Sequence, residues 1–243
     1  MENIIEVKDV EMHFNMSKER IDNLKEYFIK LIKRQLMYED FTALNKVSVD
    51  IKRGEVFGLI GRNGSGKSTL LKTISGILKP TVGQVKVKGS IAPLIELGAG
   101  FDLDLTAREN IFLNGSVLGF SNKMIAEKFD DIVDFSELHE FLDVPMKNYS
   151  SGMVARIGFA VATMVKPDIL IVDEILSVGD FLFQQKCEKR INDLMDGGTT
   201  VIIVSHALEQ IRRLCTRVMW LDKGIVKMVG DTKSVCDAYE KAE

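Results

Sequence analysis

The sequence predicts an α/β fold in which a mostly parallel sheet carries a phosphate-binding loop, and the following observations support this. Residues 169–173 and 200–204 are nearly all apolar, which is typical of strands buried on both faces of a parallel sheet. Helical segments lie between the predicted strands, so strands and helices alternate along the chain. A glycine-rich stretch joins one predicted strand, residues 55–60, directly to a helix.

The chain begins with short β-type runs at residues 4–10 and 47–51. Between them, residues 17–37 place apolar side chains on one helical face and most of their Lys and Arg on the other. This pattern predicts a basic amphipathic helix, which can lie along a membrane interface or dock against the cytoplasmic helices of a partner. A helix that packs on its own domain with a solvated basic face explains the pattern equally well, so both interpretations stay open.

The glycine-rich stretch "GRNGSGKST" matches the pattern G-x-x-x-x-G-K-[ST] in full. Its glycines let backbone N–H groups turn inward around phosphate oxygens, and the dipole of the following helix adds positive potential. Lys67 adds a full charge for the β- and γ-phosphates, and Ser68 is the expected Mg²⁺ ligand. A chance lysine in a glycine-rich turn would not explain the strand before it and the helix after it. The expected nucleotide-binding residues are Gly61, Asn63, Gly64, Ser65, Gly66, Lys67, Ser68 and Thr69.

Two further predicted strands end in residues suited to the hydrolysis of a nucleoside triphosphate. The stretch "PDILIVDE" places Asp173 at the C-terminal tip of a buried strand, where its carboxylate can hold Mg²⁺. Glu174 follows, where it can orient and activate the attacking water. The stretch "TVIIVSH" ends in His206, which is placed to hydrogen-bond a γ-phosphate. The simpler alternatives are surface acids that cap a strand and a histidine with a structural role.

Residues 105–148 interrupt the alternation with helix-like segments and no buried strand, which predicts an inserted helical lobe. The stretch "YSSGM" follows and opens a helix with Ser150, Ser151 and Gly152, called here the serine cap. A serine hydroxyl and free N–H groups at a helix N-terminus are good ligands for a γ-phosphate. Because the cap lies at the far end of the lobe, we expect it to serve the loop of a second copy. The simpler interpretation is an ordinary N-cap that stabilises its helix by about 1 kcal/mol.

At 243 residues, the chain is long enough for one α/β domain with an inserted lobe. Its net charge of −3 gives no support to a nucleic-acid binder, whose surface is usually basic. The widely spaced Cys187, Cys215 and Cys236 indicate reduced thiols in a cytosolic protein. The N-terminal acids are unlike a signal peptide, and no apolar run approaches the roughly 20 residues that span a bilayer.

In order, "GRNGSGKST", "YSSGM", "ILIVDE", "LSVGD" and "VSH" resemble the motifs of the ATP-binding cassette (ABC) ATPases, over essentially the whole chain. In that family they correspond to the Walker A loop, signature motif, Walker B strand, D-loop and switch histidine. The resemblance implies a P-loop NTPase fold with a RecA-like core, an antiparallel β subdomain and an inserted helical subdomain at about residues 97–150. Residues 1–243 then form one nucleotide-binding domain that binds ATP and Mg²⁺. The implied catalytic residues are Lys67, Glu174 and His206, with Asp180 of the D-loop at the nucleotide.

The family also has an aromatic residue in the early β subdomain that stacks on adenine. Phe14 in "VEMHF" is our choice for this role, with Tyr38 as the second candidate. The chain departs from the common signature Leu-Ser-Gly-Gly-Gln, and it lacks the usual glutamine of the loop that enters the helical subdomain. Glu96 lies near that point and is a candidate Mg²⁺ ligand.

The stretches "YSSGM", "ELGAGFDLDLTARENI" and "DEILSVGDFLFQQKC" together resemble one branch of the family. This branch contains the ATPase subunits of bacterial exporters for O-antigen polysaccharide and teichoic acid. The resemblance implies two ATPase subunits paired with polytopic membrane permease subunits, a lipid-linked glycan as cargo, and a location at the cytoplasmic face of the membrane. Longer members carry a C-terminal glycan-recognition domain, and we expect none here because the sequence stops at Glu243.

Other functional classes fit the sequence less well. A phosphate-loop kinase or GTPase lacks a "YSSGM" helix start, and the Asn-Lys-x-Asp guanine reader of GTPases is absent. An ABC ATPase that acts as a clamp on ribosomes or DNA usually has two cassettes in one chain or a long coiled-coil insertion. Together with the ATPase of another ABC transporter, such a clamp is the alternative to glycan export.

Overall fold

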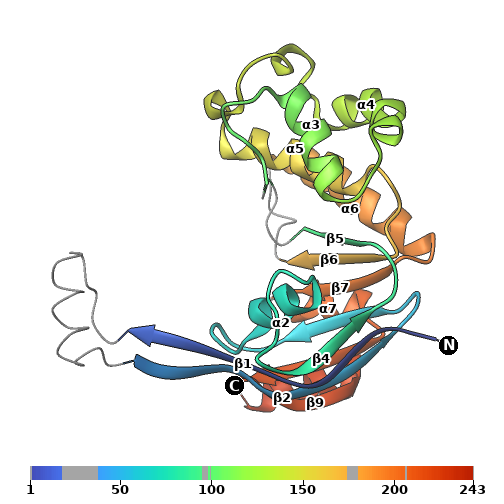
Figure 1. The fold of residues 1–243 in the computed structure, drawn as a ribbon. Coiled ribbons are helices and arrows are strands. Elements are labelled where there is room, and N and C mark those ends of the chain that lie inside the picture. Colours follow the sequence, from blue (N-terminus) through green and yellow to red (C-terminus); the bar gives the residue numbers. More distant parts are fainter. Residues whose placement is uncertain are drawn as a thin grey trace, which may run out of the picture.

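The computed structural model describes residues 2–17, 38–94, 98, 100–173, 180–205 and 207–242, without the side chains at positions 16, 17, 38, 39 and 173. In these ranges the chain forms two sheets and a group of helices above them (Figure 1). The predicted amphipathic helix at residues 17–37 lies outside the described residues except for Ser17, whose backbone ends β1. No described helix has the length and apolar character that a bilayer crossing requires.

An antiparallel sheet of three strands has the order β2-β1-β4. Its strands are β1 (Asn3–Ser17), β2 (Tyr38–Lys52) and β4 (Val82–Val87). The first two are much longer than the predicted runs 4–10 and 47–51, because they pair with each other as far as Ser17 and Tyr38. Backbone irregularities at Asp9 and Lys46, both with positive φ, interrupt this ladder and hide its length from the sequence pattern.

A second sheet of six strands has the order β5-β6-β7-β3-β8-β9. Neighbouring strands run parallel except for β9, which is antiparallel to β8. Every parallel strand therefore ends at the same edge of the sheet, where ligands bind in open α/β folds. The strands are β3 (Val56–Ile60), β5 (Ile91–Pro93), β6 (Ile169–Asp173), β7 (Thr200–Val204), β8 (Arg217–Asp222) and β9 (Ile225–Asp231).

This sheet separates two hydrophobic cores, and the alternation of side chains in β6 and β7 shows how. Leu170 and Val201 point into the core shared with the helical lobe. Ile169 and Ile202 point into the core shared with the three-stranded sheet and with α2 (Lys67–Ile74). Because both faces are covered, the apolar runs predicted as doubly buried strands are confirmed. The described helices that follow β6 along the chain are α6 (Phe181–Asp196), α7 (Leu208–Leu214) and α8 (Thr232–Ala242).

The helical lobe stands apart from the three-stranded sheet (Figure 1) and is inserted between β5 and β6. It contains α3 (Ala107–Val117), α4 (Asn122–Ser136) and α5 (Ser151–Thr163), with short 3₁₀ turns at His139–Phe141 and Met146–Asn148. A capping box between Thr106 and Glu109 starts α3. The predicted lobe at residues 105–148 contains α3 and α4, and α5 follows it.

Lys223 and Gly224 form the turn of the hairpin between β8 and β9. Its turn residues have positive φ, as short hairpin turns require. The turn is also bonded to its surroundings, because Gly224 donates its N–H to the Ser65 carbonyl and accepts from the N–H of Asn45, each at 2.8 Å. The hairpin thus links β2 to the predicted phosphate-binding loop.

All three cysteines are free and buried. Burial raises the pKa of the Cys187 and Cys215 thiols to about 12, so both are protonated at neutral pH. Packing is therefore the role of these thiols in the fold.

Candidate nucleotide-binding site

The loop between β3 and α2 has the backbone shape expected of a phosphate-binding loop. Gly61, Gly64 and Gly66 have φ angles of 149°, 76° and 105°, which other residues rarely adopt. Gly61 also lies against β8, since a Cβ there would be 2.1 Å from the Leu221 carbonyl oxygen. The loop therefore wraps closely around the start of α2 and leaves its N–H groups for a ligand.

Lys67 is the first residue of α2, and its side chain is buried inside the loop. Its Nζ donates to the carbonyl oxygens of Gly61 at 2.6 Å and Arg62 at 3.0 Å. A buried ammonium group needs such partners, because its charge is costly to remove from water. Phosphate oxygens would offer the same group stronger, charged acceptors. The position therefore suits the predicted role of Lys67.

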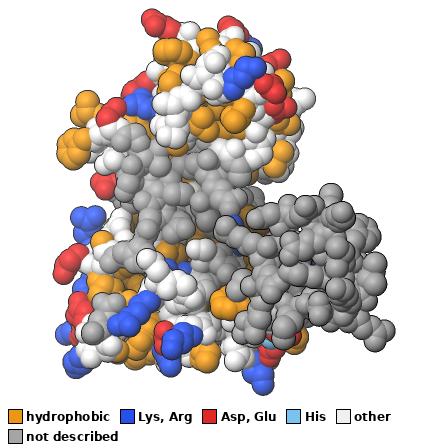
Figure 2. All heavy atoms as spheres, turned by 90° about the vertical axis from the view of Figure 1, so that its left-hand side faces the viewer, with side chains coloured by type: hydrophobic (Ala, Val, Ile, Leu, Met, Phe, Trp, Pro, Cys, Tyr) orange, Lys and Arg blue, Asp and Glu red, His pale blue; other side chains and the backbone are white. Residues whose placement is uncertain are grey.

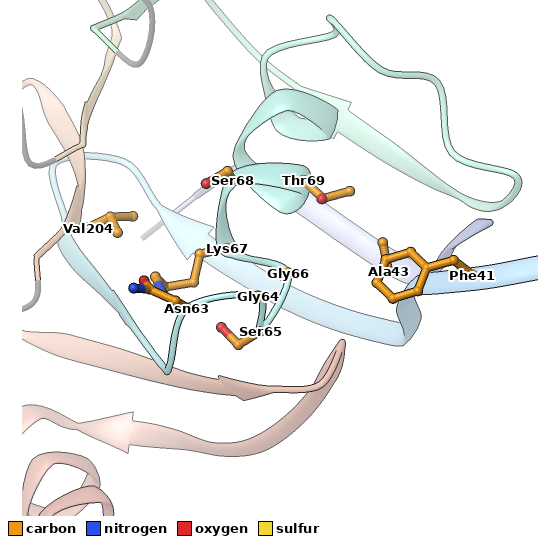
Figure 3. A pocket seen from close by; sticks show the side chains of 10 residues that line it. All are labelled: Phe41, Ala43, Asn63, Gly64, Ser65, Gly66, Lys67, Ser68, Thr69 and Val204. Atoms are coloured by element: carbon orange, nitrogen blue, oxygen red, sulfur yellow. The ribbon is translucent and has the colours of Figure 1, made fainter. Parts of the chain in front are cut away.

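A cavity of about 290 Å³ opens above the loop (Figure 3). Its lining includes seven of the predicted nucleotide-binding residues, Asn63, Gly64, Ser65, Gly66, Lys67, Ser68 and Thr69, together with Phe41, Ala43 and Val204. Ser65 is buried, and its hydroxyl has no hydrogen-bond partner among the described residues. Buried polar groups are normally paired, so this hydroxyl fits a site that receives a polar ligand.

Among the described side chains, the aromatic one that lines this cavity is Phe41 and not Phe14. Phe41 of β2 is 45% exposed and lines the cavity, whereas Phe14 of β1 is half-buried and packs against the core of the three-stranded sheet. The two are directly opposed in the β1–β2 ladder, so their side chains share one face of that sheet. Phe41 lies in the part of β2 that extends before the predicted run 47–51, so the local sequence pattern did not indicate it. The adenine contact of Phe14 stays a prediction, and the side chain of Tyr38 lies outside the described residues.

The predicted Walker B strand, β6, and the strand before the switch histidine, β7, both end beside the phosphate-binding loop. The Cα of Asp173, the last residue of β6, is paired with Val204 of β7, and Val204 is paired with Leu59 of β3. The end of β6 and the phosphate-binding loop therefore lie at the same edge, with the cavity-lining Val204 between them. The side chain of Asp173 and the residues Glu174, His206 and Glu96 lie outside the described residues.

The serine cap begins α5 as predicted. Ser150 is the N-cap, and its Oγ accepts the N–H of Met153 at 3.2 Å. Ser150 and Ser151 are exposed, and the Tyr149 hydroxyl fixes the preceding turn by donating to the Phe141 carbonyl at 2.6 Å. In Figure 1 the start of α5 lies in the helical lobe and α2 lies in the lower body. Within one chain the serine cap and the phosphate-binding loop are thus on separate parts of the fold.

Asp180 is the N-cap of α6. Its Oδ1 accepts the N–H of Phe183 at 3.0 Å, and its Oδ2 accepts from the Arg156 guanidinium at 2.6 Å. The Phe183 N–H is the main cause that lowers the pKa of this carboxyl, and Arg156 lowers it further. Asp180 is therefore ionised at neutral pH, while its predicted nucleotide contact stays a prediction.

The described residues offer one of the predicted oxygen ligands for a magnesium ion. The Ser68 side chain is exposed at the cavity, beside the predicted phosphate-binding loop residues. A hydroxyl oxygen is a hard donor of the kind that Mg²⁺ accepts, so the site fits this ion. Within the described ranges no group of three or more His, Cys, Asp or Glu gathers as a metal cage.

Comparison with known proteins agrees with this geometry. Residues 44–177 match the sequence profile described as ABC transporter. The O-antigen export system ATP-binding protein RfbB of Klebsiella pneumoniae is 44% identical over 202 residues, which cover 83% of this chain and 82% of that protein. The teichoic acids export ATP-binding protein TagH of Levilactobacillus brevis is 44% identical over 237 residues, which cover 98% of this chain but only 64% of that protein.

Solved structures show the same fold. A structure described as a dimeric bacterial ABC transporter cassette, MJ0796, superposes with a TM-score of 0.72 at 24% identity, covering 94% of this chain and 98% of that chain. The predicted α/β fold with an antiparallel sheet and an inserted helical lobe is thereby confirmed.

Proposed function

This chain belongs to the ABC transporter family, and we propose that it is the ATP-hydrolysing subunit of a bacterial exporter for lipid-linked polysaccharide. The observation that carries the ATPase part is the meeting of the phosphate-binding loop with the ends of β6 and β7 at one sheet edge. Similarity to relatives named for O-antigen and teichoic acid export supports the class of cargo.

In this proposal the residues at the sheet edge divide the work of hydrolysis. Lys67 and the loop N–H groups bind the phosphates of ATP, and Phe41, which lines the cavity, stacks on the adenine. Ser68 and Asp173, with Glu96 as a further candidate, would hold Mg²⁺, which neutralises phosphate charge when bound. Glu174 orients a water and accepts its proton as the water attacks the γ-phosphorus and the bond to the bridging oxygen breaks. His206 hydrogen-bonds the γ-phosphate.

The serine cap completes the site of a second copy. Ser150 and Ser151 are exposed on the helical lobe, away from the loop of their own chain, and the start of α5 supplies free N–H groups. Two copies arranged head to tail would enclose two ATP molecules between loop and cap. The fold shared with a dimeric cassette supports this arrangement.

The helical lobe is the part that we propose to meet the membrane permease. It exposes several large apolar side chains, and the face of the lobe seen in Figure 2 carries many hydrophobic atoms. The exposed apolar residues are Leu103, Leu113, Val117, Met124 and Phe141. Exposed apolar surface of this kind favours a protein partner, and the net charge of −3 gives no support to nucleic acid. The proposed location is accordingly the cytoplasmic face of the cell membrane.

A lysine pair tests the proposal. Lys67→Ala should abolish phosphate release by the purified protein, and cells that carry it should lose surface polysaccharide and accumulate the lipid-linked precursor inside. Lys79→Ala, at an exposed position away from the cavity, is the matched control and should behave as the parent protein. Hydrolysis that survives Lys67→Ala would refute the ATP site. Lost hydrolysis with normal surface polysaccharide would refute the export assignment alone.

A further inference from the structure

The guanidinium of Arg156 joins three elements of the fold. Arg156 lies on α5, one turn beyond the serine cap, and its side chain is only 15% exposed. Nη1 donates to Glu137 Oε2 at 2.8 Å and Nη2 donates to Asp180 Oδ2 at 2.6 Å. The group also lies 4.5 Å from the centre of the Phe183 ring. The planar, several-donor guanidinium suits these contacts better than the compact ammonium group of a lysine.

The partners of Arg156 belong to different parts of the molecule. Glu137 is the C-cap of α4 in the helical lobe, and Asp180 is the N-cap of α6. Below this network the rings of Phe135, Phe159 and Phe183 pack against one another, with centroids 5.6 to 6.5 Å apart. The aromatic rings give the lobe its apolar contact with α6, and Arg156 adds a directional polar contact.

The position of the serine cap depends on such contacts. The C-terminal end of α5 is fixed, because a short connection joins it to the buried strand β6. Its N-terminal end carries the exposed Ser150 and Ser151. Arg156 is five residues from Ser151, about 8 Å along a helix. Its pairing with Asp180 therefore limits how far the cap can move relative to α6.

Asp180 lies on the chain shortly after the proposed catalytic carboxylates. Residues 174–179 connect β6, which ends at Asp173, to Asp180. The pair Arg156–Asp180 thus connects the serine cap to the segment that follows Asp173 and Glu174. In the proposed dimer these two parts serve different ATP molecules, since the cap serves the partner's site and the carboxylates serve the chain's own.

We propose that Arg156 is a positioning residue that couples the two ATP sites by holding the serine cap in a fixed relation to Asp180. The inference rests on the dimer proposed above. The serine cap and Asp180 of each chain then move together. Loss of this link should weaken closure of the dimer and the cooperativity of hydrolysis, without changing the affinity of a single chain for ATP.

Lys186 provides a matched control. It also bonds Glu137, at 3.0 Å, and donates to the carbonyl oxygens of Asp134 at 3.2 Å and Phe135 at 2.9 Å. Lys186 is the first cause, and Arg156 the next, that lowers the pKa of Glu137. Lys186→Gln therefore loosens the same end of α4 and leaves the pairing of Arg156 with Asp180 in place.

The test uses the full chain with Glu174→Gln, which should slow hydrolysis and let ATP hold the dimer. Sedimentation in the presence of ATP and Mg²⁺ would then measure the dimer dissociation constant. We expect Arg156→Gln to raise this constant at least tenfold, Arg156→Lys to give an intermediate value, and Lys186→Gln to leave it within twofold of the parent. In the chain that retains Glu174, Arg156→Gln should lower the Hill coefficient of hydrolysis toward one.

Asp180→Asn is a second variant, because asparagine keeps the N-cap of α6 while it removes the charge that Arg156 binds. It should reproduce the effect of Arg156→Gln, and the double variant should be no worse than either single variant. Equal dimerisation of Arg156→Gln and its parent, or an equal loss in Lys186→Gln, would overturn the positioning role and leave the proposed function intact. A parent that stays monomeric with ATP would instead refute the dimer itself.

Discussion

Replacement of Gly61 by alanine should destabilise the protein more than the same replacement at Gly64, although both residues lie in the phosphate-binding loop. Both have positive φ, which costs about 1–3 kcal/mol when the residue is not glycine. Their surroundings differ. A Cβ at Gly61 would lie 2.1 Å from the Leu221 carbonyl oxygen and 2.7 Å from the Ser65 hydroxyl, whereas a Cβ at Gly64 would meet nothing within 4 Å.

The size of the difference in stability depends on the group that the added Cβ would contact. The Leu221 oxygen belongs to the backbone of β8 and cannot rotate away, so the loop itself must shift. Overpacking of this kind adds about 1–3 kcal/mol. Gly61→Ala should therefore lower the free energy of unfolding by about 2–6 kcal/mol, against about 1–3 kcal/mol for Gly64→Ala. The same shift displaces the Gly61 carbonyl that Lys67 contacts at 2.6 Å, so ATP affinity should fall as well.

Urea unfolding followed by circular dichroism measures the free energy of unfolding of the parent and both variants. Titration with a fluorescent ATP analogue measures the affinity of each folded protein. Equal stability of the two variants would refute the close packing of the loop against β8. Unchanged affinity in a destabilised Gly61→Ala would show that the loop and Lys67 are not mechanically linked.

Two other perturbations have defined outcomes. Phe41→Ala should weaken ATP binding roughly tenfold, since base–aromatic stacking contributes about 1–3 kcal/mol. If titration shows that Phe14→Ala loses ATP affinity and Phe41→Ala does not, Phe14 is the residue that contacts the adenine. Asp168→Asn should make the loss of stability in acid shallower. The Ser90 N–H is the main cause that lowers the pKa of Asp168 from its ordinary value of 3.8, and Arg53 lowers it further. The ionised carboxylate therefore stabilises the folded state at pH values above 3.8. This stabilisation is lost as the pH falls through the lowered pKa of the folded protein. Parallel unfolding profiles from about pH 5 to pH 2 would contradict this assignment.

The parts of the fold that could be predicted are those whose signal is local. The phosphate-binding loop is a single continuous motif, and β6 and β7 are nearly all apolar because both faces are covered. The turn at Lys223-Gly224 has the residues that a short hairpin needs. In each case the sequence signal lies within a few neighbouring residues.

The features without a local signal depend on pairing between distant parts of the chain. The length of β1 and β2 comes from the register between them, and bulges near Asp9 and Lys46 break the alternation that would have revealed it. Phe41 reaches the cavity only because of that register. The pairing of Arg156 with Asp180 joins residues 24 positions apart on different helices, so no local pattern could indicate it.

The pairing of Ser17 with Tyr38 places the two ends of residues 18–37 on adjacent strands, so this stretch can be replaced by another. A stretch whose two ends leave and re-enter a scaffold on adjacent strands can be replaced by one of another length without stretching the ladder beneath it. The corresponding stretch of a relative could therefore be grafted between these two positions. In such chimaeras the ATP machinery stays constant while only the graft varies.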